Sequence, residues 1–62
     1  MNATEVKRNI GKKVLVHYKQ LMFVGKLAGF APGFNNRDVL VHFPGKAKPD
    51  RFYASKVEEL KP

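Results

Sequence analysis

The feature that most constrains this chain is the apolar stretch from Leu21 to Phe30, which Gly25 and Gly29 interrupt. A nearly all-apolar run of this length predicts a long strand. Glycine inside a strand marks a bulge or a sharp bend, where a sheet curls on itself. Two such glycines, four residues apart, predict a bent strand that is shared between the two halves of a small barrel.

The segment before this stretch shows a strict period of two. Val14, Val16 and Tyr18 alternate with the residues between them, and they are β-branched or aromatic, which is typical of a strand. Lys19-Gln20 then predicts a tight turn, although the pair lacks the Asn-Gly or Asp-Gly signature. Three further short strands are expected, with a single helical turn before the last one. Their ranges are 38–43, 51–53 and 57–60, with the helical turn at 54–56 and loops at 31–37 and 44–50.

The first ten residues predict a short helix, capped by Asn2 or Thr4 and stopped at Gly11. Val6 and Ile10 lie four residues apart and so share one helix face. A helix this short does not persist alone in water, so we expect these two side chains to plug an open end of the barrel.

These elements predict an all-β fold, a small five-stranded SH3-like barrel with a short N-terminal helix and a one-turn helix before the last strand. We expect residues 1–62 to form one domain. Barrel closure would remove free strand edges. The side chains expected in the core are Val14, Val16, Phe23, Leu27, Val39, Val41, Phe52, Val57 and Leu60, capped by Val6 and Ile10.

The charge of the chain points to its class of partner. Twelve basic residues face five acidic ones, which gives a net charge of +7. Residues 1–51 hold ten of the basic groups and three of the acids, whereas the last eleven residues hold two of each. Such an excess attracts polyanions, so we expect nucleic acid rather than an anionic membrane or an acidic protein.

Two loops and the start of the first strand supply the candidate contacts. We expect the basic side chains there to bind phosphates, which gives salt-dependent affinity without sequence preference. Phe34, within Pro-Gly-Phe-Asn-Asn-Arg, is the candidate for stacking on a base or wedging into a groove. Alternatively, Phe34 folds back over the core, and the basic loop only aids solubility. The phosphate-binding candidates are Lys12, Lys13, Arg37, Lys46, Lys48 and Arg51.

Enzymatic chemistry has little support in the sequence. His17 and His42 have no carboxylate nearby in sequence and are expected to be exposed strand residues. Ser55, the only serine, lacks a nucleophile elbow, and Glu58 and Glu59 point to opposite faces of a strand. We therefore predict no enzyme, no metal and no cofactor. The absence of cysteine and of a signal peptide favours a cytoplasmic protein.

Residues 11–18, 23–27, 39–43 and 51–57 resemble the strand order of Tudor-like and chromo-barrel SH3-like domains. In those families a Val-x-Val-x-Tyr strand comes first, and the barrel closes through a one-turn helix. The resemblance implies an aromatic cage for methyl-lysine, with Tyr18, Phe23 and Phe43 as its rings. The absence of tryptophan and of acidic residues near these strands argues against such a cage.

A second resemblance is to Sm-like RNA-binding barrels. Gly25-Lys-Leu-Ala-Gly-Phe30, followed by Phe34-Asn35, is similar to the first Sm motif, with Ala31 in place of its usual aspartate. This resemblance implies RNA binding by a ring of subunits. The second Sm motif has no counterpart in the chain.

These observations predict a basic barrel that binds nucleic acid, DNA rather than RNA, with limited sequence specificity. The alternative is a protein-interaction or assembly module, including a homo-oligomer, that uses an exposed aromatic surface around Met22. A third alternative is an oligomeric enzyme built at a subunit pore.

Overall fold

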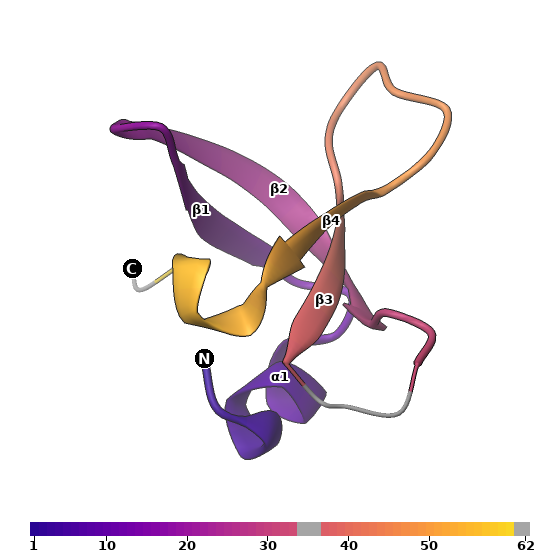
Figure 1. The fold of residues 1–62 in the computed structure, drawn as a ribbon. Coiled ribbons are helices and arrows are strands. Elements are labelled where there is room, and N and C mark those ends of the chain that lie inside the picture. The colour runs from indigo at the N-terminus through magenta and orange to yellow at the C-terminus, as the bar shows by residue number, and fades with distance from the viewer. Residues whose placement is uncertain (34–36, 61–62) are drawn as a thin grey trace.

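The computed structural model describes residues 1–33 and 37–60, which form five antiparallel strands and two short helices (Figure 1). The predicted all-β class with five strands is confirmed, with the N-terminal helix and the one-turn helix before the last strand in their expected places. The elements are α1 (Ala3–Asn9), β1 (Lys13–Tyr18), β2 (Leu21–Phe30), β3 (Asp38–His42), β4 (Asp50–Tyr53), η1 (Ala54–Lys56) and β5 (Val57–Glu59).

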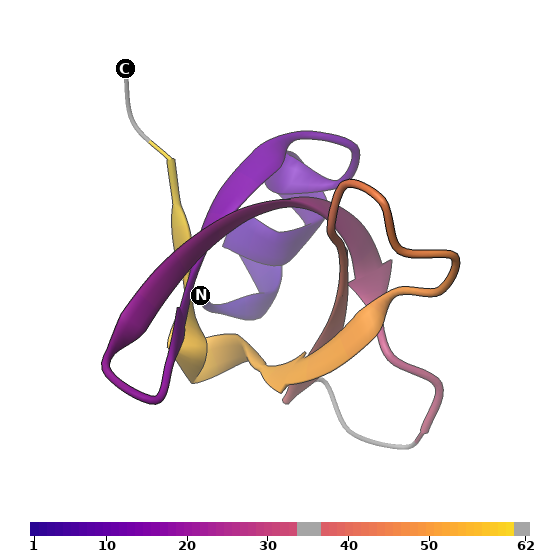
Figure 2. The ribbon, with the colours of Figure 1, turned by 90° about the horizontal axis from the view of Figure 1, so that it is seen from above.

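The strands form one curved sheet in the order β4-β3-β2-β1-β5 (Figure 2). The expected closure of the barrel was wrong, because β4 and β5 remain the two edges of the sheet within the described chain. The reason lies in η1, which joins these two short strands directly and places Ala54 against the core. A single helical turn therefore occupies the position where hydrogen bonds between β4 and β5 would close the barrel.

The turn between β1 and β2 fixes the register of this hairpin. Lys19 and Gln20 both have positive φ, 50° and 65°, as a type I′ turn requires. Tyr18 therefore pairs with Leu21, and Lys13 pairs with Lys26. Register changes between Leu27 and Gly29, where β2 pairs with β3, so the predicted irregularity in β2 is confirmed at Gly29.

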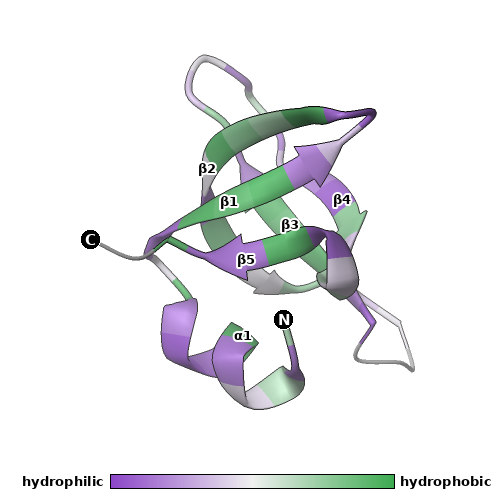
Figure 3. Ribbon diagram, turned by 90° about the vertical axis from the view of Figure 1, so that its left-hand side faces the viewer, coloured by the Kyte–Doolittle hydropathy of each residue, from purple (hydrophilic) through white to green (hydrophobic). Residues whose placement is uncertain are grey.

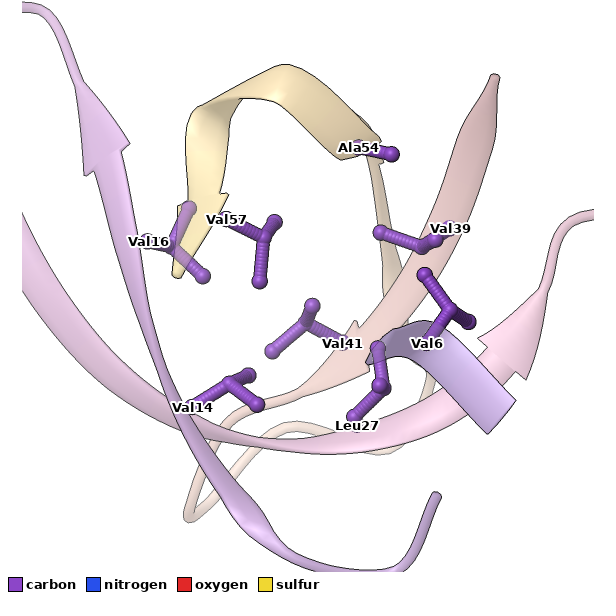
Figure 4. Packing of buried hydrophobic residues seen from close by; sticks show 8 residues of the cluster. All are labelled: Val6, Val14, Val16, Leu27, Val39, Val41, Ala54 and Val57. Carbon is purple, nitrogen blue, oxygen red and sulfur yellow. The ribbon is translucent and has the colours of Figure 1, made fainter. Parts of the chain in front are cut away.

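The core consists of small branched side chains that meet between the curved sheet and α1 (Figure 4). Complete burial of a valine or leucine contributes about 1.5–3 kcal/mol, so these few side chains hold most of the stabilising apolar contact. Phe30, Phe43 and Phe52 pack against them and are half-buried. The buried side chains are Val6, Val14, Val16, Leu27, Val39, Val41, Ala54 and Val57.

Three residues predicted for the core are exposed instead, namely Ile10, Phe23 and Leu60. Ile10 caps the C-terminus of α1 with an extended backbone, so it leaves the helix face that buries Val6. Phe23 lies between the hairpin turn and Gly25, outside the cluster of valines. Leu60 follows the end of β5.

Helix α1 lies below the sheet and covers one end of the core (Figures 1 and 3). Asn2 caps it in a reciprocal capping box with Glu5, which settles the choice between Asn2 and Thr4. Leu27 of β2 holds the following turn, because its carbonyl accepts from the Gly11 amide and its own amide donates to the Lys12 carbonyl.

Candidate nucleic-acid interface

Three strands bring basic side chains into one row on the outer face of the sheet. Lys13 of β1 lies directly opposite Lys26 of β2, and Lys26 lies opposite His42 of β3. All three residues are exposed, whereas their neighbours in sequence, such as Val14 and Val41, are buried. Neither lysine forms an ion pair with any carboxylate of the described residues. We call Lys13, Lys26 and His42 the basic row.

The sequence prediction omitted Lys26, although the signal for it was present. In a two-residue hairpin centred on Lys19-Gln20, Tyr18 pairs with Leu21, and each step back along β1 matches a step forward along β2. Five such steps lead to Lys13 and Lys26. The predicted turn therefore already determined that these two lysines face each other.

Lys12 and Lys48 supply further cations without acidic partners among residues 1–33 and 37–60. Lys12 lies in the turn before β1 and is exposed beside Lys13. Lys48 is exposed in the loop between β3 and β4, which begins directly after His42. Both were predicted, and both remain available to an external anion.

The other predicted cations of this region are already engaged within the chain. Nη2 of Arg51 lies 2.6 Å from Oδ2 of Asp38, and Nζ of Lys46 lies 2.7 Å from Oδ2 of Asp50. Both basic side chains are 54% exposed. Exposed ion pairs of this kind contribute only about 0–1 kcal/mol, so a phosphate can displace either carboxylate at small cost.

The described members of the predicted site therefore lie in two groups. Lys12 and Lys13 lie at β1, whereas Arg51 lies on β4, three strands away in the sheet order and so roughly 14 Å along the sheet. Arg37 stands just before β3, and its carbonyl accepts a hydrogen bond from the Ala54 amide. Phe34 lies outside the described residues, so its stacking role stays a prediction.

A groove with an aromatic floor lies between the β1–β2 hairpin and the segment that contains β4 and η1. Its rings pack edge to face in a chain, with centroids 6.0 Å apart for Tyr18 and Phe52, 5.9 Å for Phe52 and Phe43, and 6.2 Å for Phe43 and Phe23. Tyr53 lines the same groove and is 65% exposed. We call this the aromatic groove.

Charged side chains form the rim of the aromatic groove. Asp38 and Asp50 lie there, so the expectation that no acidic residue stands near these rings was wrong. Strand pairing explains the error, because β4 brings Asp50 opposite Val41, and Asp38 opposite Tyr53. Both carboxylates are paired with the Arg51 and Lys46 described above. Lys56 of η1 also lines the rim and has no acidic partner among the described residues.

No protein-family model, curated protein or solved structure matches this chain.

The two histidines lie apart from each other. His17 pairs with Met22, and its Nε2 lies 3.1 Å from Oε1 of Glu58 on β5, whereas His42 pairs with Lys26. The sequence had suggested no carboxylate near either histidine, and β1–β5 pairing provides one. Residues 1–33 and 37–60 contain no group of three potential metal ligands. Across the same described ranges, neither helix has the length and apolar character needed to span a membrane.

Proposed function

We propose that this chain binds nucleic acid, DNA in preference to RNA, through phosphate contacts with limited sequence specificity. The observation that carries the proposal is the position of Lys13 directly opposite Lys26 on exposed strands. Like charges directly opposite each other destabilise a sheet. A polyanion bound across the two strands relieves this repulsion, and the exposed imidazole of His42 extends the row by one strand.

The surrounding charge supports the same partner. The chain carries a net charge of +7. Besides the two lysines of the basic row, Lys12 and Lys48 also have no acidic partner in the described chain. Arg51 and Lys46 can exchange their exposed ion pairs for phosphate oxygens. Lysine contacts to phosphates position a protein on nucleic acid but carry no sequence information, which is the basis for the limited specificity.

We also infer that the fold is of the SH3-like kind. The support is the order of the elements: a hairpin, a strand bent at Gly29, two further strands and a one-turn helix that leads into the last strand. Pairing of β5 with β1 brings the chain end back to its first strand, as the Tudor-like resemblance implies.

Fluorescence anisotropy of a labelled DNA duplex, titrated at several salt concentrations, tests the proposal. In a duplex each phosphate contact contributes about −0.9 to the slope of log K against log salt, so Lys26→Gln should reduce affinity and flatten this slope by about one contact. Lys7→Gln is the matched control, because Lys7 is an exposed lysine that lies on α1 and not on the three strands of the basic row. The same titration with an RNA duplex tests the preference for DNA.

Two outcomes would overturn the proposal. One is the absence of binding at low salt. The other is an equal loss of affinity in Lys7→Gln and Lys26→Gln, which would mean that net charge alone, and not the basic row, accounts for binding.

One observation favours a second candidate, a protein-interaction or assembly module. Residues 21–24, at the start of β2, are four consecutive exposed apolar residues, and β4 and β5 leave two strand edges. Exposed apolar runs and free edges are typical of association surfaces. Sedimentation of the free protein tests this candidate. A dimer that Met22→Lys dissociates would support it, and a monomer at high concentration would exclude self-association.

A further inference from the structure

We propose that the aromatic groove receives unpaired bases, so that the nucleic acid this chain binds is single-stranded over the groove. This inference rests on the proposed function and names its substrate class. It moves the stacking role from Phe34, predicted from the sequence, to rings that the structure brings together from β1, β2, β4 and the position directly after β3.

Three rings of the groove are exposed to solvent. Tyr18 and Phe23 are 42% and 43% exposed, and Tyr53 is 65% exposed. Phe43 and Phe52 lie between them and are half-buried against the core, which holds the outer rings in place. Aromatic side chains held on strands in this way stack on bases of any sequence, because every base has a π-face.

The charges around the groove match a phosphate backbone. Lys56 lines the rim without an acidic partner in the described chain, and Nζ of Lys19 lies 5.3 Å from the centroid of the Tyr18 ring. The two acids of the rim, Asp38 and Asp50, are each neutralised by a basic side chain. An aromatic floor with a cationic rim is the arrangement that single-strand-binding proteins use.

The groove and the basic row lie on different faces of the sheet and meet only at the hairpin edge of the groove, because Phe23 shares the inner face of β2 with Gly25 and Leu27 whereas Lys26 faces outward. At this edge Val24 lines the groove from the outer face of β2, and Lys26 follows it by two residues on that face. Two residues along a β-strand span roughly 7 Å, so a nucleic-acid strand that leaves the groove over Val24 can place a phosphate beside Lys26. A duplex cannot use the rings in this way, because its bases present only their edges outside the stack.

Tyrosine fluorescence tests this inference directly. The chain contains two tyrosines and no tryptophan, and both tyrosines line the groove. Titration with an oligothymidylate of about ten nucleotides, a length within the usual site sizes of small single-strand-binding barrels, should quench this emission. A blunt duplex of the same length should bind with its phosphates but leave the emission unchanged.

Ring variants separate stacking from charge. Phe23→Leu and Tyr53→Leu keep an apolar side chain while removing the ring, and each should weaken oligothymidylate binding by about tenfold. Because these variants change no charge, the slope of log K against log salt should equal that of the unaltered protein, whereas Lys26→Gln should make this slope less steep. Leu60→Ala is the control, since Leu60 is exposed and apolar but lies outside the groove. Circular dichroism of each variant confirms that it is folded.

The possible results distinguish this inference from the proposed function. If neither the oligothymidylate nor the duplex binds at low salt, both proposals are wrong. If both bind equally, without quenching and without an effect of the ring variants, the chain binds nucleic acid but the groove does not hold bases. Self-association that Tyr53→Leu abolishes, together with an absence of quenching, would assign the groove to a second copy of the chain.

Discussion

Gly25 of β2 lies so close to Val41 of β3 that a Cβ atom built on Gly25 would be 2.5 Å from Cγ1 of Val41. The same atom would lie 2.9 Å from the ring of Phe43. We therefore expect Gly25→Ala to destabilise the protein by about 1–3 kcal/mol through overpacking. Urea denaturation measures this change, and an unaltered midpoint would contradict it.

Gly45→Ala is an instructive counterpart to Gly25→Ala. A Cβ on Gly45 would meet no atom within 4 Å, but its φ of +82° disfavours any side chain. We expect a cost of about 1 kcal/mol from backbone strain alone. The two variants should also differ at the groove, because only Gly25→Ala displaces Phe43, which contacts Tyr18 through Phe52, and so should alter the fluorescence of Tyr18.

The β1–β2 turn offers a stabilising change. Gln20 has a φ of 65°, which costs a residue with a side chain about 1 kcal/mol and costs glycine almost nothing. Gln20→Gly should therefore stabilise the protein by about 0.5–1 kcal/mol and keep Lys19 over the Tyr18 ring. Gln20→Ala, which retains the strain, should bring no such gain. Thermal unfolding of the three proteins compares them, and an equal gain in both variants would refute the turn assignment.

The strands could be predicted from the sequence, because the patterns that indicate a strand lie within a few neighbouring residues. Alternation at Val14, Val16 and Tyr18 and the glycine at position 29 are read from neighbouring residues. Closure and core membership depend instead on how distant segments meet. Phe23 is a large apolar residue of the kind that fills cores, yet it is exposed, because the side chain of Val41 packs over Gly25 and Phe23 lies beyond it towards the hairpin turn.

The same distinction explains the candidate site. Lys12, Lys13 and Lys48 were found because they are basic and lie near predicted strand ends or loops. The sequence prediction missed the ion pairs of Lys46 and Arg51, and the reason differs between the two pairs. Asp38 meets Arg51 only through the pairing of β3 with β4, and Asp50 meets Lys46 only through the conformation of the loop before β4.

Acid stability should depend on the ion pair between Arg8 of α1 and Glu59 of β5. The hydrogen bond from Arg8 lowers the pKa of Glu59 below its ordinary value of 4.5. A carboxylate whose pKa is lower in the folded state adds stability above its unfolded pKa, and this stability is lost as the pH falls through the folded value. Glu59→Gln should therefore make unfolding less sensitive to pH in this acidic range.

Arg8→Gln should likewise make the free energy of unfolding less dependent on pH in the acidic range, since it removes the hydrogen bond that lowers the pKa of Glu59. In the double variant, the free energy of unfolding should depend on pH as much as in either single variant, because the two residues act through one interaction. Lys7→Gln, which changes a neighbouring cation of α1 outside the ion pair, should leave the profile as it is. Denaturation at a series of pH values measures these effects, and additive flattening would show that other groups are responsible.

The basic row leads to a prediction in which stability and binding change in opposite directions. Lys26→Glu places a carboxylate opposite Lys13, and an opposite-charge pair across strands contributes about 0.2–1 kcal/mol. The variant should be more stable than the unaltered protein, yet bind nucleic acid at least about tenfold more weakly, because it loses a phosphate contact and adds repulsion. Adding Lys13→Glu restores a like-charged pair, so the double variant should lose the gain in stability and bind still more weakly. Denaturation and anisotropy on the same samples measure both quantities. A fall in stability together with affinity in Lys26→Glu would show that this lysine supports the fold, and that its position opposite Lys13 has no bearing on a polyanion.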